Sequence, residues 1–237
     1  MAVKQGDFVR IEYTGKLVSG EIFDTTSVDE AKKGGIFNSK MNYKPALIIV
    51  GKSQAVPGLE EALVGMDVGQ EKETDVPATK GFGERNPNLI NVMPLARFQS
   101  ERIDPVPGMI VSLDNKDATI RSVSGGRVVV DFNHPLAGQQ LKYKLKVLAV
   151  LVTPEERVKA LFDESDMDGT ASLDGGVVML KVKADSSYNF LVKKQSLVNW
   201  LVEMVPEIKS VKVNEEYEIT EGKAGRSVKA LENQESA

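Results

Sequence analysis

Apolar and polar residues alternate with a period of two near the start of the chain and again after residue 140. Val9, Ile11 and Tyr13 are each followed by a polar residue. In the segment 141–149 every odd position is apolar, and lysines fill the even positions up to residue 146. Successive side chains of a strand point to opposite faces, so both segments are predicted to be half-buried strands. The apolar run at 46–50 predicts a short buried strand.

One segment between these strands has the spacing of a helix. Its apolar positions are Leu59, Ala62, Leu63 and Met66. Pro57 stands in the first turn of this predicted helix, where a missing backbone N–H costs no hydrogen bond. A helix of about two to three turns fits the pattern.

Two stretches lack either period. Residues 25–43 are polar and are predicted to be a long loop. Residues 84–107 contain four prolines and are predicted to be irregular. After them, apolar segments flank Gly125 and Gly126, which predicts a hairpin over about 108–130.

The last third of the chain predicts a small α/β domain. Thr153, Pro154 and Glu156 have the spacing of a capping box, so a helix is expected to begin here. The later predicted elements are a strand at 176–183, a helix at 196–205 and a strand at 208–219. From about residue 222 the chain is polar and is expected to fray.

Composition limits the classes of protein that remain. The 237 residues are enough for two or three domains, and 41% of them are hydrophobic. No apolar run approaches the roughly 18 residues of a membrane span, and no signal peptide is evident, so no membrane role is expected. With no cysteine and a net charge of -4, the chain predicts a cytoplasmic protein without a broad nucleic-acid surface.

Several separated motifs resemble the FKBP-type peptidyl-prolyl cis-trans isomerases. They are "YTGKLVSGEIFDTT", "VGKSQAVPGLEEALVGMDVGQEKE" and "GFGE", in that family's order. The segment "NHPLAGQQLKYKLKVLAV" is similar to the end of the SlyD subgroup, in which an insert-in-flap domain interrupts the FKBP flap. The resemblance covers about residues 3–152, and the remainder is similar only in layout to the long-type archaeal members.

This resemblance implies an α+β fold and a division into domains. An FKBP antiparallel sheet wrapped on a short helix is expected, with a β-rich insert-in-flap domain and a C-terminal small α/β domain. The implied boundaries are 1–85 with 131–152 for the isomerase domain, 86–130 for the insert, 153–222 for the C-terminal domain, and 223–237 for a flexible tail.

The resemblance also implies an isomerase that needs no cofactor. Rotation about an X–Pro bond faces a barrier of roughly 20 kcal/mol, because amide resonance must be broken. No proton moves, so an apolar cup with a few directed hydrogen bonds suffices. The catalytic residues carried over from the family are Tyr13, Phe23, Asp24, Val56, Phe82 and Tyr143. The substrate-binding residues carried over are Ala46, Leu59, Leu136 and Ala137.

Individual positions have plainer interpretations and some depart from the family. Tyr13, Phe23 and Leu59 could each be ordinary core residues, and Asp24 could cap a turn. By resemblance, Asp24 orients the Tyr13 hydroxyl, and the Val56 N–H holds a substrate carbonyl. Leu59 replaces the family's floor tryptophan, and Ala46 and Phe82 replace an aromatic residue and a tyrosine.

The single histidine and an acidic segment are the remaining candidates for chemistry. One histidine without cysteine cannot form a usual zinc cluster, so His134 is predicted to shape a turn near the lip of the pocket. The segment 163–175 resembles a calcium loop, but Gly175 stands where the bidentate glutamate is needed. A solvated acidic turn is the favoured interpretation, and no metal site is expected.

Two functions from different classes stay open. The chain is either an isomerase that assists folding or a holdase chaperone whose pocket is incidental, and the resemblance implies that the two activities coexist. The expected partners are unfolded or nascent polypeptides with X–Pro bonds. The apolar segments "IVSL" and "RVVVDF" of the insert either offer strand edges to such chains or form an ordinary small core. Trp200 and Met204 share a helix face, which either packs on the C-terminal sheet or forms a homodimer.

Overall fold

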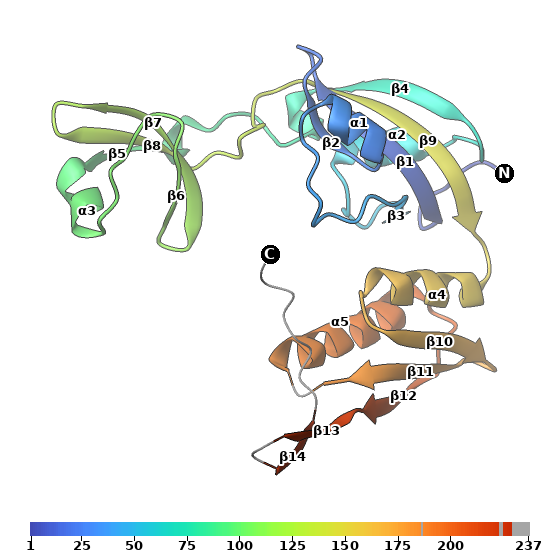
Figure 1. Cartoon of the computed structure of the whole chain (residues 1–237). Helices are drawn as coiled ribbons and strands as arrows, with labels where there is room; N and C mark the ends of the chain where they lie inside the picture. Colours follow the sequence, from blue (N-terminus) through green and yellow to red (C-terminus); the bar gives the residue numbers. More distant parts are fainter. Residues whose placement is uncertain (186, 223–224, 229–237) are drawn as a thin grey trace.

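The computed structural model describes residues 1–185, 187–222 and 225–228, which form three groups of elements (Figure 1). The first group is the N-terminal unit, a five-stranded antiparallel sheet in the order β2-β1-β9-β4 with β3 paired to β1. Its strands are β1 (Phe8–Leu17), β2 (Ile22–Thr25), β3 (Ala46–Ile49), β4 (Glu71–Val76) and β9 (Leu141–Leu151). The helices of this unit are α1 (Val28–Lys33) and α2 (Pro57–Leu63).

The core of the N-terminal unit lies between the sheet and α2. The two segments with a period of two became β1 and β9, which pair along ten residues of β1. Their inward side chains pack on Leu59 and Leu63 of α2, and Leu63 is fully buried. The predicted strands and the predicted helix of this unit are therefore confirmed. Burial of one face by a short helix explains why the apolar residues alternate.

The second group, called the insert here, is a four-stranded antiparallel sheet in the order β5-β8-β7-β6 with one helix. Its elements are β5 (Ile90–Pro94), α3 (Leu95–Ser100), β6 (Ile110–Leu113), β7 (Lys116–Ser124) and β8 (Arg127–Asp131). The predicted hairpin at Gly125–Gly126 is confirmed, and both glycines have positive φ, as a tight hairpin turn requires. The insert has its own apolar cluster around Phe98 and Ile120.

The third group, called the C-terminal unit here, has two helices on one face of a three-stranded sheet, toward the N-terminal unit (Figure 1). Its elements are α4 (Pro154–Glu164), β10 (Gly169–Asp174), β11 (Val177–Ala184), α5 (Tyr188–Met204) and β12 (Ser210–Tyr217). The capping box of Thr153 and Glu156 is present as predicted. A two-stranded ribbon of β13 (Ile219–Gly222) and β14 (Gly225–Val228) follows.

Four predictions of local structure were wrong, because single-sequence patterns are weak signals that other contacts can override. The segment 25–43 contains α1, which Ser27 caps. The segment 84–107 contains the 3-10 helix Pro87–Leu89, β5 and α3. The helix predicted at 196–205 begins at Tyr188, eight residues earlier. The acidic segment contains β10, so the C-terminal unit has one more strand than predicted. The flexible tail expected at 223–237 stays a prediction: Gly225–Val228 form β14, and residues 223–224 and 229–237 lie outside the described residues.

A shared apolar cluster joins the C-terminal unit to the N-terminal unit. Phe8 of β1 and Ile49 of β3 belong to the same buried cluster as Leu161 of α4 and Leu201 of α5. Phe8 is 1% exposed and Ile49 is 2% exposed. The domain boundaries expected from the sequence stay a prediction, but this cluster crosses the expected boundary at residue 152.

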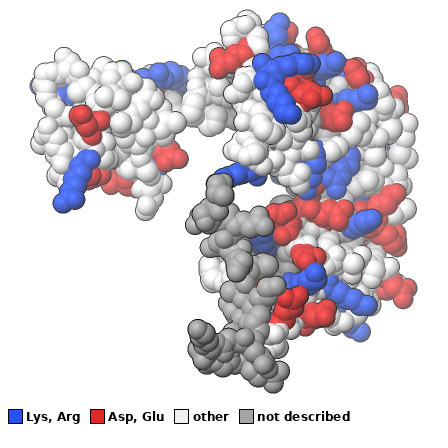
Figure 2. Space-filling view, in the orientation of Figure 1, with Lys and Arg blue, Asp and Glu red and all other residues white. Residues whose placement is uncertain are grey.

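The surface charges are of both signs. In Figure 2, basic and acidic side chains are interspersed over the N-terminal and C-terminal units, and the visible face of the insert is mostly uncharged. Within the described residues, no helix is long and apolar enough to cross a membrane.

Candidate active site

A cavity of about 560 Å³ opens on the N-terminal unit, between the sheet and the start of α2. Residues from β1, β2, β3, β9 and α2 line it, together with the segments before α2 and after β4. One residue, Glu164, comes from α4 of the C-terminal unit. The lining residues are Tyr13, Asp24, Ala46, Leu47, Ile48, Gln54, Ala55, Val56, Leu59, Phe82, Tyr143 and Glu164.

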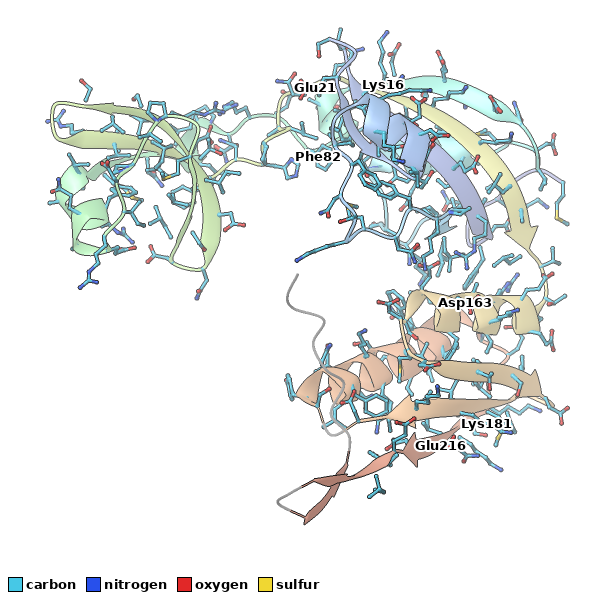
Figure 3. The ribbon with its side chains drawn as sticks, in the orientation of Figure 1. Lys16, Glu21, Phe82, Asp163, Lys181 and Glu216 are labelled. Atoms are coloured by element: carbon cyan, nitrogen blue, oxygen red, sulfur yellow. The ribbon has the colours of Figure 1, made fainter. Side chains whose placement is uncertain are left out.

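Aromatic rings form one wall of the cavity. The rings of Tyr13 and Tyr143 are tilted against each other, with centroids 6.2 Å apart. Phe23 does not line the cavity but stands edge-on to Tyr143 at 5.8 Å and to Phe82 at 6.2 Å. Such edge-to-face pairs add stability beyond the area they bury. Phe23 therefore holds the other rings in place, and Phe82 lies on the side of the unit that faces the insert (Figure 3).

Gly15 makes room for this aromatic wall. A Cβ atom at Gly15 would lie 2.6 Å from Cζ of Phe23 and 3.0 Å from Cε1 of Tyr143. Contacts this short force the rings to move, so only glycine fits between them. Sequence analysis did not identify Gly15, although it lies inside the first family motif. Its signal is a glycine within a strand, which often marks a close approach of other groups to the backbone.

The floor of the cavity is Leu59, which is 3% exposed. Val56 precedes α2 as its N-cap residue, and no side chain caps this end of the helix. Within the described residues the N–H of Val56 donates to no other group. A free N–H at the start of a helix is suited to a carbonyl oxygen of a bound peptide.

Glu60 supports this end of α2 from behind. Its carboxylate is buried and accepts hydrogen bonds from the N–H of Gly51 at 2.8 Å and of Ala55 at 3.1 Å. These bonds fix the segment that carries Val56 into the cavity. Sequence analysis missed Glu60 because an acidic residue on a short helix is usually exposed.

The hydroxyl groups in the cavity remain protonated at neutral pH. The Tyr13 hydroxyl donates to Oδ2 of Asp24 at 2.7 Å. Burial and this hydrogen bond raise the pKa of Tyr13 well above its ordinary value. Burial, with the charge of Asp24, raises the pKa of Tyr143 to about 12. Both hydroxyl groups are therefore neutral and able to donate hydrogen bonds. The hydrogen bond from Tyr13 to Asp24 is consistent with the expected orientation of the Tyr13 hydroxyl by Asp24.

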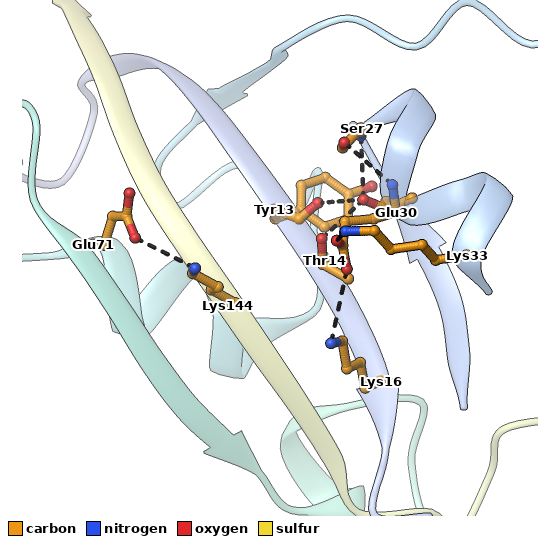
Figure 4. Close-up of polar contacts among 9 residues, drawn as sticks. Tyr13, Thr14, Lys16, Ser27, Glu30, Lys33, Glu71 and Lys144 are labelled. Atoms are coloured by element: carbon orange, nitrogen blue, oxygen red, sulfur yellow. Dashed lines mark hydrogen bonds and ion pairs between the residues drawn. The ribbon is translucent and has the colours of Figure 1, made fainter. Parts of the chain in front are cut away.

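Paired charges lie on α1 and on neighbouring strands of the same sheet (Figure 4). Glu30 lies 2.8 Å from Lys33 and 3.9 Å from Lys16, and Glu71 lies 3.4 Å from Lys144. The hydrogen bond to Lys33 lowers the pKa of Glu30. Pairs this exposed stabilise a fold little, and they provide no catalytic group.

His134 contacts the cavity only from outside. Its ring stacks on Phe82 with centroids 4.1 Å apart and planes 8° apart. The N–H of Leu136 donates to its Nδ1 at 3.1 Å, and its own carbonyl accepts from Ala137, so His134 shapes a turn as predicted. The structure does not bring Leu136 or Ala137 into the cavity lining, and Ala137 is buried. Their substrate-binding role has no support from the cavity.

The acidic segment after α4 forms no cluster. Gly169–Asp174 is strand β10 and is not a solvated turn, so that interpretation is wrong for these residues. Asp168 pairs with Lys183 at 3.0 Å, and Asp166 lies 3.9 Å from Lys193. Across the described part of the chain, no group of three or more histidine, aspartate or glutamate side chains is placed to hold a metal ion.

Comparisons with known proteins match both the N-terminal unit and the insert. The family described as "FKBP-type peptidyl-prolyl cis-trans isomerase" matches residues 1–99, and "FKBP26, IF domain" matches residues 91–136.

Individual relatives align over a similar part of the chain. A short-type peptidyl-prolyl cis-trans isomerase of Methanocaldococcus jannaschii is 37% identical over 145 residues, which are 61% of this chain and 92% of that protein. The FKBP-type isomerase SlyD of Helicobacter pylori is 31% identical over 143 residues, 58% of this chain and 76% of that protein. An FKBP-type 16 kDa isomerase of Escherichia coli is 29% identical over 154 residues, 63% of this chain and 94% of that protein.

Proposed function

Because this chain belongs to the FKBP-type peptidyl-prolyl cis-trans isomerases, we propose that it twists X–Pro bonds in the cavity above Leu59. The chain is a SlyD-like isomerase, and its family acts on polypeptides. The observation that carries the proposal is the position of the free Val56 N–H at the edge of an apolar, aromatic-walled cavity. No other described cavity combines these features with the family's motifs.

The proposed reaction requires binding that is stronger for a twisted amide than for a planar one. A proline ring would rest on Leu59 between the rings of Tyr13 and Tyr143. The Val56 N–H would hold a carbonyl of the substrate, and the hydroxyl that Asp24 orients would face the rotating bond. A cavity without water removes the solvation that favours the planar amide, which lowers the barrier to rotation. Each 1.36 kcal/mol removed from the barrier gives about a tenfold gain in rate.

Asp24→Ala tests this site. The change removes the acceptor that fixes the Tyr13 hydroxyl, so turnover of a short proline peptide should fall about tenfold, with the chain still folded. Asp29→Ala, an exposed acidic residue in the first turn of α1, is the matched control and should retain full turnover. Full activity in a folded Asp24→Ala variant would remove Asp24 from the mechanism.

A second proposed activity is chaperone-like binding of unfolded chains by the insert. β5 and β6 are the two edges of its sheet, and each presents a backbone that another strand could pair with. Val92 on β5 is 62% exposed, and Ile110 on β6 is 67% exposed. An apolar edge beside a mostly uncharged surface suits an extended apolar chain. A holdase with incidental isomerase activity is the alternative, and it predicts that cavity variants leave refolding assistance intact.

Two further expectations stay predictions. A homodimer through the C-terminal unit is supported by apolar residues on the outer face of α5, of which Tyr188 is 82% exposed and Leu191 is 49% exposed. Met204 packs on the C-terminal cluster, whereas Trp200 is only partly covered. Analytical ultracentrifugation of the full chain and of a Tyr188→Ser, Leu191→Ser variant would test the dimer.

The cytoplasmic location expected from the sequence is likewise a prediction.

A further inference from the structure

The isomerase cavity is completed by a residue that lies outside the isomerase fold. Glu164 is the last residue of α4 and lines the cavity beside Ala46 and Gln54. Ala46 carries only a methyl group, so on this side the N-terminal unit leaves space that the end of α4 closes. In Figure 3, Asp163, which precedes Glu164 in the chain, lies on α4, below the N-terminal unit.

Glu164 binds two basic residues of the N-terminal unit. One carboxylate oxygen pairs with Nη1 of Arg10, on β1, and the other lies 3.1 Å from Nζ of Lys44. Each cation also has a backbone partner. Arg10 donates to the carbonyl of Pro45 at 3.3 Å, and Lys44 donates to the carbonyl of Asp163 at 3.4 Å. Lys44 and Pro45 lead directly into Ala46 of the cavity wall. Lys44 is therefore held by α4 directly, and Pro45 is held by it indirectly, through Arg10.

Burial makes this group stronger than an ordinary surface ion pair. The side chains of Arg10 and Glu164 are 20% and 21% exposed. Partial burial reduces screening by water, and one carboxylate shared by two cations forms a small network. A second ion pair joins the same two units, between Lys52 and Glu203 at 3.6 Å, but its side chains are 42% and 62% exposed. Glu203 does not line the cavity, so it provides an internal control.

We propose that Glu164 is a positioning residue of the isomerase, acting through Arg10 and Lys44 on the wall that Ala46 forms. The C-terminal unit is then part of the active site. A peptide whose proline occupies the cavity passes the end of α4, and the rigidity of this wall governs how tightly the peptide is held. The inference rests on the proposed use of this cavity.

The test compares full-length Glu164→Ala, Glu164→Gln and Glu203→Ala by kcat, KM and Tm, with a short proline peptide as substrate. We expect Glu164→Ala to raise KM about threefold to tenfold while kcat changes less than about twofold, because a loosened wall weakens binding of substrate and transition state alike. Glu164→Gln should lie between the wild type and Glu164→Ala, since its amide oxygen still accepts from Arg10. Glu203→Ala should keep the wild-type KM. Added salt should raise the KM of the wild type only slightly, because a partly buried ion pair is screened less than an exposed one, and it should leave the KM of Glu164→Ala unchanged.

Several outcomes would overturn the inference. If Glu164→Ala lowers Tm but leaves KM equal to that of Glu203→Ala, Glu164 only joins the two units. Asp24→Ala separates this failure from failure of the proposed site. If Asp24→Ala loses turnover and Glu164→Ala does not raise KM, only the role of Glu164 falls. If neither variant changes turnover, the proposed cavity is wrong as well. Should Glu164→Ala not fold, Glu164→Gln is judged by the same criterion.

Discussion

The insert and the C-terminal unit are attached to the N-terminal unit by different kinds of contact. The insert is connected through two chain segments and a group of polar side chains, and its apolar cluster contains only its own residues and the adjoining Phe132. The C-terminal unit is connected by one covalent link and shares its apolar cluster with Phe8 and Ile49 of the N-terminal unit. An interface without a shared core permits relative motion, whereas a shared core makes two units fold together. We therefore expect the insert to be separable and the C-terminal unit to be integral.

The polar attachment of the insert centres on Asp131, which is 1% exposed. Its carboxylate pairs with Arg85, from the segment that enters the insert, and with Arg121 of β7 at 2.9 Å. Asn133 donates to the same carboxylate and also bonds the backbone of Asn86, so the two connecting segments are held side by side. A buried charge this well paired specifies one geometry more than it adds stability.

The largest expected effect comes from truncating the shared core. Phe8→Ala should lower the free energy of unfolding by about 3 to 5 kcal/mol, because a fully buried aromatic ring is removed from the contact of two units. Unfolding monitored by circular dichroism would give the value. Limited proteolysis should show both units becoming sensitive together.

Phe98→Ala is the matched variant, since Phe98 is equally buried but lies in the insert. It should expose the insert to proteolysis while turnover of a short peptide changes less than about twofold. If Phe8→Ala loosens the C-terminal unit alone, or Phe98→Ala abolishes peptide turnover, the contrast between the two attachments is wrong.

Replacing residues 86–130 by a short flap should have the next largest effect. Catalysis of proline-limited refolding should fall about tenfold or more, because the insert no longer raises the local concentration of prolines near the cavity. Turnover of a short peptide should be spared. Stopped-flow refolding of a proline-limited protein and a peptide assay on the same preparation would separate the two. Equal loss in both assays would mean that the insert only supports the cavity.

Asp131→Asn should have a smaller effect on the same function. It keeps the shape of the side chain but leaves Arg85 and Arg121 without their anionic partner, so the insert should no longer hold one orientation. We expect about a threefold loss in refolding catalysis, with peptide turnover unchanged. Asp117→Asn, at an exposed position of the same sheet, is the control. Unchanged refolding by Asp131→Asn would show that the orientation of the insert is not used.

The smallest effect is expected at His134, where the insert rejoins the N-terminal unit. His134→Gln loses the stacking on Phe82, and turnover should fall less than about twofold because no proton is transferred. Turnover should also be flat over about pH 6 to 8, where an ordinary histidine titrates.

The tyrosines support the same pH profile, because raised pKa values keep Tyr13 and Tyr143 protonated well above neutral pH. The stability that these neutral hydroxyls contribute is fully present below the unfolded pKa of about 10 and is lost as pH rises through the higher folded values. A marked pH dependence of turnover between about pH 6 and 8 that His134→Gln abolishes would contradict the assignment.

The sequence by itself was sufficient for the parts of the fold that repeat a local rule. The alternation in β1 and β9 predicted two strands, and Thr153 with Glu156 predicted the start of α4. The order of the motifs identified the family and most of the cavity lining. The alternation and the capping box each depend on residues a few positions apart, so both can be recognised in a short piece of sequence.

Only the tertiary structure decided which surfaces are covered. The alternation of β1 directs Val9 and Ile11 to the core, and on the same rule Phe8 and Arg10 would face solvent. In the structure the C-terminal unit covers that second face, so Phe8 is buried and Arg10 binds Glu164, 154 residues away. A period of two in the hydrophobic pattern shows how a strand divides its side chains between two faces. It does not record which distant segment packs on each face, because that depends on shape and charge brought together by the whole fold.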